Sequence, residues 1–443
     1  MTNLNRPAGA VVPEAPAPAL PATALGLTGY FFIGTAAVLV PSVMPFITSE
    51  YMATGLTLAA IGFIFPARAV GGIFGNLLAG VTSDRLGYSK LVWIAALALA
   101  ASMALTAAAR PWLFFLAGFA LISIVQSSLT TGINAMVADA NRASRARALN
   151  VLHGVYAVGA TISPLVFGLI LEQGVPWRWA MAATGLLWFV YGLGAFLLYR
   201  TVYPPPASAP APAADEPEPD SEEKKTPQNG AKTSFLSSTW DTLRDILYSN
   251  WVMLRNVGFL SLFLIAFIYN GVAFSLLGWV AVFMQESVGF SIFSSISMIS
   301  VFYVALTAGR FLCAAYAERL GYAPTLLILA VGLVLTYPLV VFSTTAAPLV
   351  IGIFLTGLTL SGLFPTALAF GSRLYPQQSG AVTGILNVAM IAGSMLPPLW
   401  TGIFSDIWSF QTALGINYSM AFLLLVVCLY LARLELRARQ PQE

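Results

Sequence analysis

Two arginines, Arg68 and Arg310, are the residues of this chain best placed to do chemistry, because each lies inside a long apolar segment. A charge in such a setting costs several kcal/mol unless it faces a partner or a cavity. A guanidinium can hold a carboxylate, sulfonate or phosphate through two parallel hydrogen bonds. All 18 acidic residues fall at the ends of the apolar segments or outside them. Arg68 therefore predicts an anion-binding site.

The helical position of Arg68 supports this interpretation. It precedes Asp84 by 16 residues, which is roughly 24 Å along a helix and near the middle of a bilayer. Gly72, Gly75 and Ala79 share its face, and such a stripe of small residues is expected to face protein. The alternative is a structural arginine bonded to carbonyl groups across the bundle. Arg310 lies only about 12 Å from its helix end, which favours helix packing or an inner gate.

Other polar residues inside apolar segments are candidates for binding a small polar solute. One segment carries a polar stripe with a spacing of four residues, formed by Gln126, Thr130 and Asn134. Further donors and ring faces come from Tyr30, Tyr269, Asn270 and Asn387. The same residue types also make hydrogen bonds between membrane helices, which is the alternative for each of them.

His153 is the only histidine, and Tyr156 stands one turn further along the same helix face. Imidazole titrates near neutral pH, so His153 is a candidate for proton coupling. The alternative is a neutral residue that only makes hydrogen bonds.

The elements that position these residues are membrane helices. Hydrophobic residues make up 58% of the chain and charged residues 9%, which a water-soluble domain could hardly carry. Apolar stretches of about 20 residues predict spanning helices. We expect twelve, at 23–47, 57–82, 90–109, 111–137, 146–172, 178–199, 257–285, 291–317, 324–343, 348–371, 380–404 and 412–432.

The sequence contains the same arrangement twice. Asp84-Arg85-Leu86-Gly87-Tyr88 returns as Glu318-Arg319-Leu320-Gly321-Tyr322, and Gly159 with Pro164 and Gly168 returns as Gly393 with Pro398 and Gly402. Both sets are displaced by 234 positions (84 to 318, and 159 to 393). The repeat predicts an all-α membrane protein whose twelve helices form two pseudo-symmetric six-helix bundles, as in a secondary transporter.

Charge indicates the orientation in the membrane. Cytoplasmic termini leave 17 of the 21 Lys and Arg residues inside, as the positive-inside rule requires. We expect a bacterial-type inner membrane and no cleaved signal peptide, so the first span is retained. The predicted regions are a disordered N-terminus (1–22), the first bundle (23–200), a flexible linker (201–238), an amphipathic surface helix (239–256), the second bundle (257–433) and a tail (434–443).

The loop motif Gly80-x3-Asp84-Arg85-x-Gly87-x2-Lys90 resembles that of the major facilitator superfamily. The resemblance implies that Asp84, Arg85, Glu318 and Arg319 act in gating. Shorter segments look most like the fucose/proton symporter and related sugar permeases, among them Asn150-x2-His153-Gly154, Gly309-Arg310-Phe311 and Leu363-Phe364-Pro365. That branch couples protons through carboxylates in its first and fourth spans. Neither span has an interior acid here, so this coupling is not expected to carry over.

We therefore expect a transporter of a small polar, anionic solute, working by alternating access as a monomer, with a coupling proton or counter-solute. A neutral sugar permease, an exporter of hydrophobic compounds and a non-transporting assembly or sensor protein are the alternatives. No nucleotide-binding loop, paired carboxylate or metal-ligand cluster is present, so we expect no enzymatic activity, cofactor or metal. The net charge of +3 reflects membrane orientation and does not indicate nucleic-acid binding.

Overall fold

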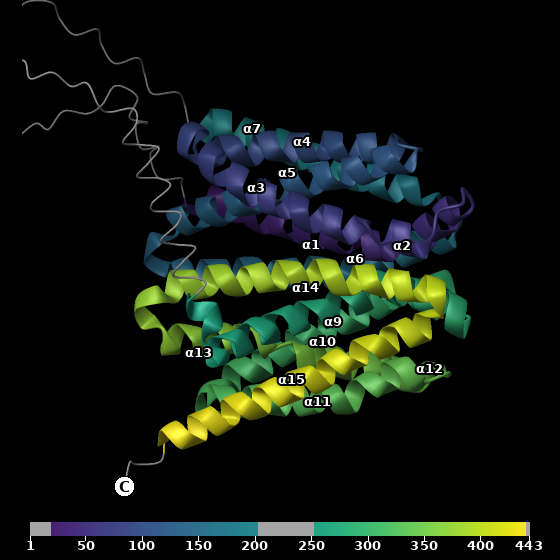
Figure 1. The fold of residues 1–443 in the computed structure, drawn as a ribbon. Helices are drawn as coiled ribbons and strands as arrows, with labels where there is room; N and C mark the ends of the chain where they lie inside the picture. The colour runs from purple at the N-terminus through teal and green to yellow at the C-terminus, as the bar shows by residue number, and fades with distance from the viewer. Residues whose placement is uncertain (1–18, 203–251, 440–443) are drawn as a thin grey trace, which may run out of the picture.

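The computed structural model describes residues 19–202 and 252–439, which are helical with short turns and contain no strand. These residues form twelve helical spans that are long and apolar enough to cross a membrane. The protein is therefore an integral membrane protein of the expected fold class. Figure 1 shows the helices running side by side in two groups, one from each half of the chain.

The first group holds six spans, one of which is broken into two helices. Its helices are α1 (Ala19–Met52), α2 (Leu58–Ile61), α3 (Ile64–Leu86), α4 (Tyr88–Ala108), α5 (Trp112–Ala140), α6 (Arg145–Glu172) and α7 (Trp177–Val202).

The second group also holds six spans. Here the fourth span is broken into two helices, whereas in the first group it is the second span. The helices of the second group are α9 (Val257–Val288), α10 (Ile292–Leu320), α11 (Tyr322–Phe342), α12 (Ala346–Leu360), α13 (Leu363–Leu374), α14 (Ser379–Ile407) and α15 (Phe410–Arg439).

The helices differ from the expected spans mainly at their ends. Helix α1 begins at Ala19 instead of 23, and α15 continues to Arg439, beyond the expected 432. Two spans expected to be continuous are interrupted, at Gly62 and Phe63 between α2 and α3 and at Ser361 and Gly362 between α12 and α13. The linker from 203 and the surface helix up to 251 lie outside the described residues.

Glycines set the closest helix contacts in both halves. A Cβ on Gly159 of α6 would collide with the Phe31 carbonyl of α1, and a Cβ on Gly393 of α14 would collide with the Phe267 carbonyl of α9. The two glycines are 234 positions apart and their carbonyl partners are 236 apart, so α6 packs on α1 much as α14 packs on α9. The repeat seen in the sequence is therefore a repeat of backbone packing.

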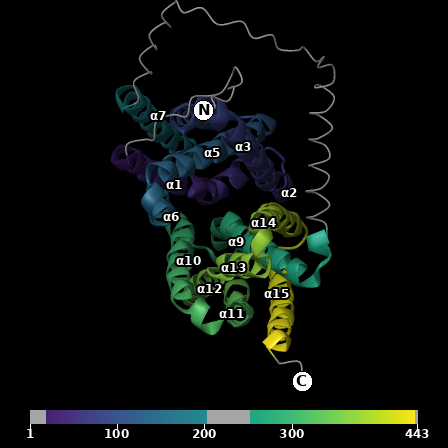
Figure 2. The ribbon, with the colours of Figure 1, turned by 90° about the vertical axis from the view of Figure 1, so that its left-hand side faces the viewer.

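The two halves meet along α6 with α10 and along α14 with α2 and α3. Figure 2 views the bundle along its length and shows the first half above the second, with these helices between them. We call the end that carries Ala19 and Arg439 the terminal end, and the opposite end, where α2 lies in Figure 1, the distal end.

Candidate functional site

A cavity of about 230 Å³ lies between the two halves. Helices α3 and α5 of the first half form one wall, and α9 and α14 of the second half form the other. Its polar lining consists of Arg68, Asn76, Ser123, Gln126, Ser127, Thr130 and Ser394. Three predicted site residues, Arg68, Gln126 and Thr130, therefore meet in one cavity.

Arg68 is half-buried, and its guanidinium carbon lies 5.5 Å from the centroid of the Phe274 ring on α9. Within residues 19–202 and 252–439, the ion pairs join Glu50 to Arg110 and Arg178, and Asp139 to Arg142. No hydrogen bond or ion pair of Arg68 is found in this part of the chain. The donors of the guanidinium are therefore unused within the described residues, and the Phe274 ring face offsets part of the cost of its burial.

Helix α5 presents its polar residues to this cavity because Ser123, Gln126, Ser127 and Thr130 follow helical spacing. The Thr130 hydroxyl donates to the Gln126 carbonyl at 2.8 Å, within the helix. The Gln126 amide has no partner in the described part of the chain, and it can therefore donate to or accept from a solute. Asn134, two turns beyond Gln126, lies near the Tyr30 hydroxyl.

A second polar cluster joins the halves beside Arg68. Arg310 Nη2 donates to the Tyr269 hydroxyl at 3.4 Å. Tyr269 stacks on Phe364 with ring centroids 6.2 Å apart. Tyr303 of α10 lies close to Tyr156, Tyr269 and Arg68. The structure thus brings Arg68 and Arg310 close to one group of tyrosines.

His153 is exposed on α6. The ring of Tyr30 meets its imidazole edge to face, with centroids 5.3 Å apart, and Arg310 is near enough to interact with it electrostatically. His153 therefore lies near Arg310, and Tyr156 lies near Tyr303, so both residues are close to the second half. Asn387, the repeat counterpart of His153, is exposed on α14.

Asn270 is positioned differently from the other candidates. Its side chain is 7% exposed, and its amide donates to the Met390 carbonyl of α14 at 2.8 Å. This bond uses the polar group to hold α9 against α14. The structure therefore places Asn270 in a helix contact and not among the residues that line the Arg68 cavity.

The repeated loop motifs lie at the terminal end. Gly87 closes α3 with φ of 78°, and Gly321 closes α10 with φ of 93°. Only glycine adopts such angles without strain, which explains why both motif copies carry it. Arg85, Glu318 and Arg319 are exposed, and the side chain of Asp84 is outside the described residues.

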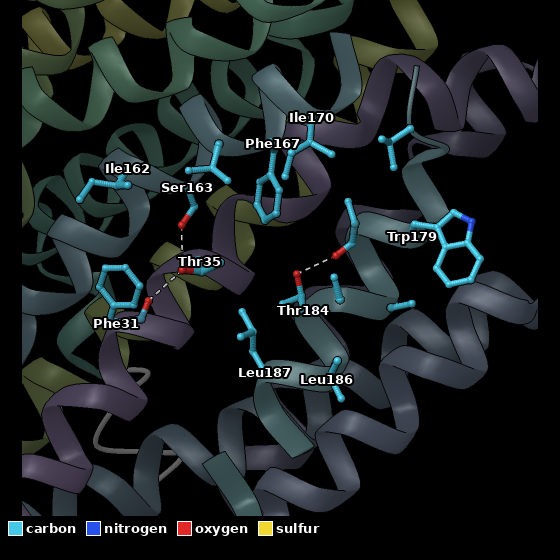
Figure 3. A pocket seen from close by; sticks show the side chains of 15 residues that line it. Phe31, Thr35, Ile162, Ser163, Phe167, Ile170, Trp179, Thr184, Leu186 and Leu187 are labelled. Atoms are coloured by element: carbon cyan, nitrogen blue, oxygen red, sulfur yellow. Dashed lines mark hydrogen bonds between the residues drawn. The ribbon is translucent and has the colours of Figure 1, made fainter. Parts of the chain in front are cut away.

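A larger cavity of about 650 Å³ opens between α1, α6 and α7 (Figure 3). Its hydroxyl groups bond to one another or to backbone: Ser163 donates to Thr35 at 2.7 Å, and Thr184 donates to the Ala180 carbonyl at 2.8 Å. The remaining surface is apolar, as Figure 3 shows for Phe167 and Trp179. This cavity therefore does not suit a polar solute.

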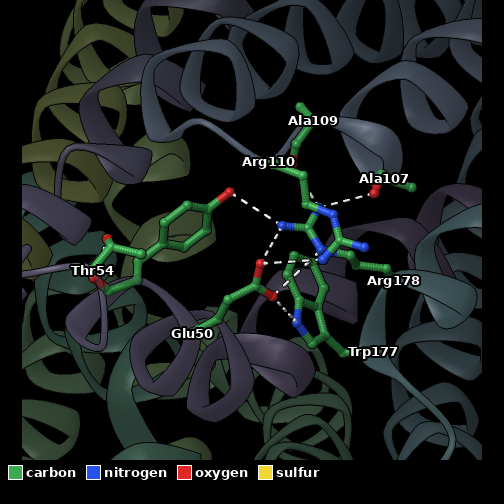
Figure 4. Close-up of polar contacts among 8 residues, drawn as sticks. Glu50, Thr54, Ala107, Ala109, Arg110, Trp177 and Arg178 are labelled. Atoms are coloured by element: carbon green, nitrogen blue, oxygen red, sulfur yellow. Dashed lines mark hydrogen bonds and ion pairs between the residues drawn. The ribbon is translucent and has the colours of Figure 1, made fainter.

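Glu50 organises the distal end of the first half (Figure 4). Its carboxylate accepts from Arg178 Nη2 at 2.6 Å and from the Trp177 indole at 2.9 Å. Arg178 also donates to the carbonyls of Ala107 and Ala109, at 2.9 and 2.7 Å. These bonds join the ends of α1, α4 and α7, so this cluster stabilises the packing of helices within the first half.

Sequence reasoning missed Asn76, Ser123 and Ser127 of the central cavity. Asn76 was detectable, because it continues the Arg68 and Gly72 face by one further turn. Ser123 and Ser127 share the helical spacing of Gln126 and Thr130, but serine alone does not distinguish a cavity position from a helix contact, because the neighbouring Ser128 hydroxyl bonds to the Gly75 carbonyl.

A family model described as the Major Facilitator Superfamily matches residues 26–348 and 298–443. Among curated proteins, the chain is 24% identical over 395 residues to the uncharacterized MFS-type transporter YfkL of Bacillus subtilis (strain 168), covering 86% of this chain and 89% of that protein. It is 21% identical over 416 residues to the glucose/mannose transporter GlcP of the same organism, covering 92% and 94%.

Solved structures share the fold at low identity. A bacterial homolog of the human lysosomal transporter Spinster, in an inward-facing and unoccupied conformation, superposes with a TM-score of 0.70 at 13% identity, covering 96% of this chain and 99% of that one. The nucleoside transporter NupG (D323A mutant) also gives 0.70, at 14% identity, covering 92% and 99%.

Proposed function

Because this chain belongs to the major facilitator superfamily, we propose that it is a secondary active transporter that moves a small polar, anionic solute by alternating access. One observation carries the choice of an anion: Arg68 lines a cavity between the halves without a carboxylate partner in the described part of the chain. A bound anion would supply the missing charge, and the two halves could then close around a neutral pair.

The size of the cavity limits the solute. A volume of about 230 Å³ has room for about eight water molecules at roughly 30 Å³ each. This favours a solute of the size of a monosaccharide or a small organic acid. The cavity does not suit a bulky hydrophobic compound, because amide and hydroxyl groups line it together with Arg68.

Each candidate residue then has a proposed role. Arg68 binds the anionic group, and Gln126 and Thr130 of α5 orient the rest of the solute. Tyr269 and Arg310 do not line the cavity, and they are proposed to act as a gate beside it in the second half. The remaining binding candidates, Tyr30, Asn134, Asn270 and Asn387, do not line this cavity, and Asn270 is proposed to hold α9 against α14.

Coupling and gating are assigned to residues outside the cavity. We assign proton coupling to His153 with Tyr156, since both face the second half. The terminal-end loops, with Asp84, Arg85, Glu318 and Arg319, would lock the state that opens at the distal end. The termini are proposed to be cytoplasmic in a bacterial-type inner membrane, and the carrier is proposed to work as a monomer.

A neutral sugar is the second candidate solute. The amides of Asn76 and Gln126 and the hydroxyl of Thr130 suit a polyol, and GlcP, a glucose/mannose transporter, is a relative at 21% identity. In this case Arg68 would donate to hydroxyl groups and would not need a negative charge on the solute.

A matched pair of solutes separates the two candidates. Purified protein in proteoliposomes is given a hexuronate and the corresponding neutral hexose, which differ only in one carboxylate. We expect binding and counterflow of the hexuronate at concentrations at least about ten-fold lower, because a charge-assisted contact adds about 1.5 kcal/mol or more. Equal affinity for both sugars would favour the neutral sugar, and screening of other small carboxylates and phosphates without any flux would refute the anion proposal.

A further inference from the structure

Two carboxylates at the distal end reach across the boundary between the halves. Asp406, near the end of α14, accepts hydrogen bonds from the backbone N–H groups of Leu58 at 2.9 Å and Ala59 at 2.7 Å. Glu172, at the end of α6, accepts from the backbone N–H of Phe293 and from the Ser291 hydroxyl. Each acid thus caps the first turn of a span in the opposite half.

The two contacts are copies of one another. Asp406 follows Glu172 by the same 234 positions that relate the repeated motifs, and Phe293 follows Ala59 by 234 positions. The first N–H groups of a helix have no partner within the helix, and they carry a partial positive charge. A carboxylate accepts hydrogen bonds from these N–H groups and is attracted by their partial positive charge. A carboxylate at a helix N-terminus therefore joins the two halves in both places, where α14 meets α2 and where α6 meets α10.

A glycine stands one turn before each acid, and these glycines are also 234 apart. A Cβ on Gly402 would lie 2.9 Å from the Leu58 carbonyl oxygen. A Cβ on Gly168 would lie 3.1 Å from the Phe293 ring and 3.3 Å from its Cα. All three distances are shorter than an ordinary side-chain contact, so each glycine lets its helix approach closely enough for the acid to reach the N–H groups.

We propose that Gly168-x3-Glu172 and Gly402-x3-Asp406 form a paired latch that holds the distal end of the carrier closed. All these hydrogen bonds must break before a solute can pass between the halves at that end. At the terminal end, Glu318 of the repeated loop motif is exposed and makes no hydrogen bond or ion pair within the described residues. The structure therefore represents the state in which the distal latch is engaged.

The latch rests on the proposed transport cycle but not on the identity of the solute. Its test is a distance measurement across the distal end without any solute. Spin labels are attached at Leu113 of the first half, which is 72% exposed, and at Thr345 of the second half, which is also exposed. The native thiols Cys313 and Cys428 are replaced by serine in all variants. Pulsed electron spin resonance then reports the distal-closed and distal-open populations.

Glu172→Ala and Asp406→Ala should each raise the distal-open population about ten-fold or more, because each removes charge-assisted hydrogen bonds that only the closed state makes. The double variant should exceed either one. Glu286→Ala is the matched control, since Glu286 is an exposed acid near the end of α9 and makes no hydrogen bond within the described residues. A double variant with the same distances as the Glu286→Ala control would overturn the proposal.

A glycine substitution tests the same latch without removing charge. Gly402→Ala places a methyl group against the Leu58 carbonyl and should also favour the open distal end. Gly384→Ala in the same helix is its control, because a Cβ there meets no atom within 4 Å. If the alanine variants of the two acids do not fold, this pair decides: identical distances in both glycine variants contradict the latch. Solute binding, measured separately, fails or succeeds independently of these distances.

Discussion

The sharpest prediction concerns Arg68, because lysine and glutamine remove different parts of its proposed contact. Lysine keeps the positive charge but cannot form two parallel hydrogen bonds, whereas glutamine also loses the charge. Each charge-assisted hydrogen bond is worth about 1.5 to 3 kcal/mol. We therefore expect Arg68→Lys to weaken binding of the anionic solute by about ten-fold or more, and Arg68→Gln by about 150-fold.

The structure provides a control for the aromatic part of this contact. Arg68 lies 5.5 Å from the Phe274 centroid, and Arg373 lies 5.9 Å from the Tyr322 centroid on α11. Arg373→Lys thus makes the same chemical change next to an aromatic ring but away from the cavity. Equilibrium binding to purified protein is the assay, with thermal unfolding to show that each variant is folded.

Two results would refute the reasoning. If Arg68→Gln binds the anion within about two-fold of the parent protein, the guanidinium does not contact the solute. If Arg373→Lys loses as much affinity as Arg68→Lys, the loss comes from the packing of the bundle. The sugar carrier would be supported by two results together. No anion would bind to the parent protein, and binding of a neutral hexose would fall only modestly in Arg68→Gln.

Three further predictions concern stability and coupling. Glu50→Gln should lower the apparent Tm by about 5 °C, because it leaves the Arg178 guanidinium, 11% exposed, without its carboxylate; an unchanged Tm would show that the backbone carbonyls suffice. Gly159→Ala should lower the Tm in thermal unfolding, whereas Gly154→Ala should not, because a Cβ at Gly154 meets no atom within 4 Å; equal effects would contradict the packing argument. His153→Asn should abolish uptake driven by a pH gradient but leave solute exchange intact, and proton-driven uptake that survives would exclude His153 as the coupling group.

Composition and the repeat predicted the architecture because both report properties of whole helices. Twelve spans, two halves and an interior position for Arg68 follow from apolar length and from a constant displacement. The breaks at Gly62 and at Gly362 did not follow, since glycine also occurs inside unbroken helices such as α6. At the second break, Ser361 packs against Gly309 of α10, a contact between distant parts of the chain that residue spacing does not report.

The polar residues were harder to assign, because helical spacing gives the face but not the neighbour. Gln126 and Asn270 are both amides inside apolar spans, yet one lines a cavity and the other bonds to the Met390 carbonyl. For the two distal acids the sequence shows a repeat but gives no reason to assign a role. Glu172 and Asp406 occupy equivalent repeat positions, but each lies at the end of a span, where a carboxylate is common and does not indicate a contact between the halves.

The distribution of charge connects the site to the gates. Acids stand at equivalent repeat positions at both ends of the bundle, Asp84 with Glu318 and Glu172 with Asp406, while the interior of the described spans keeps Arg68 without a carboxylate partner. Closing both ends around an empty cavity would bury that positive charge, which is costly. If the solute is the anion proposed above, its binding removes this cost, and closure of both ends would then depend on the presence of the solute.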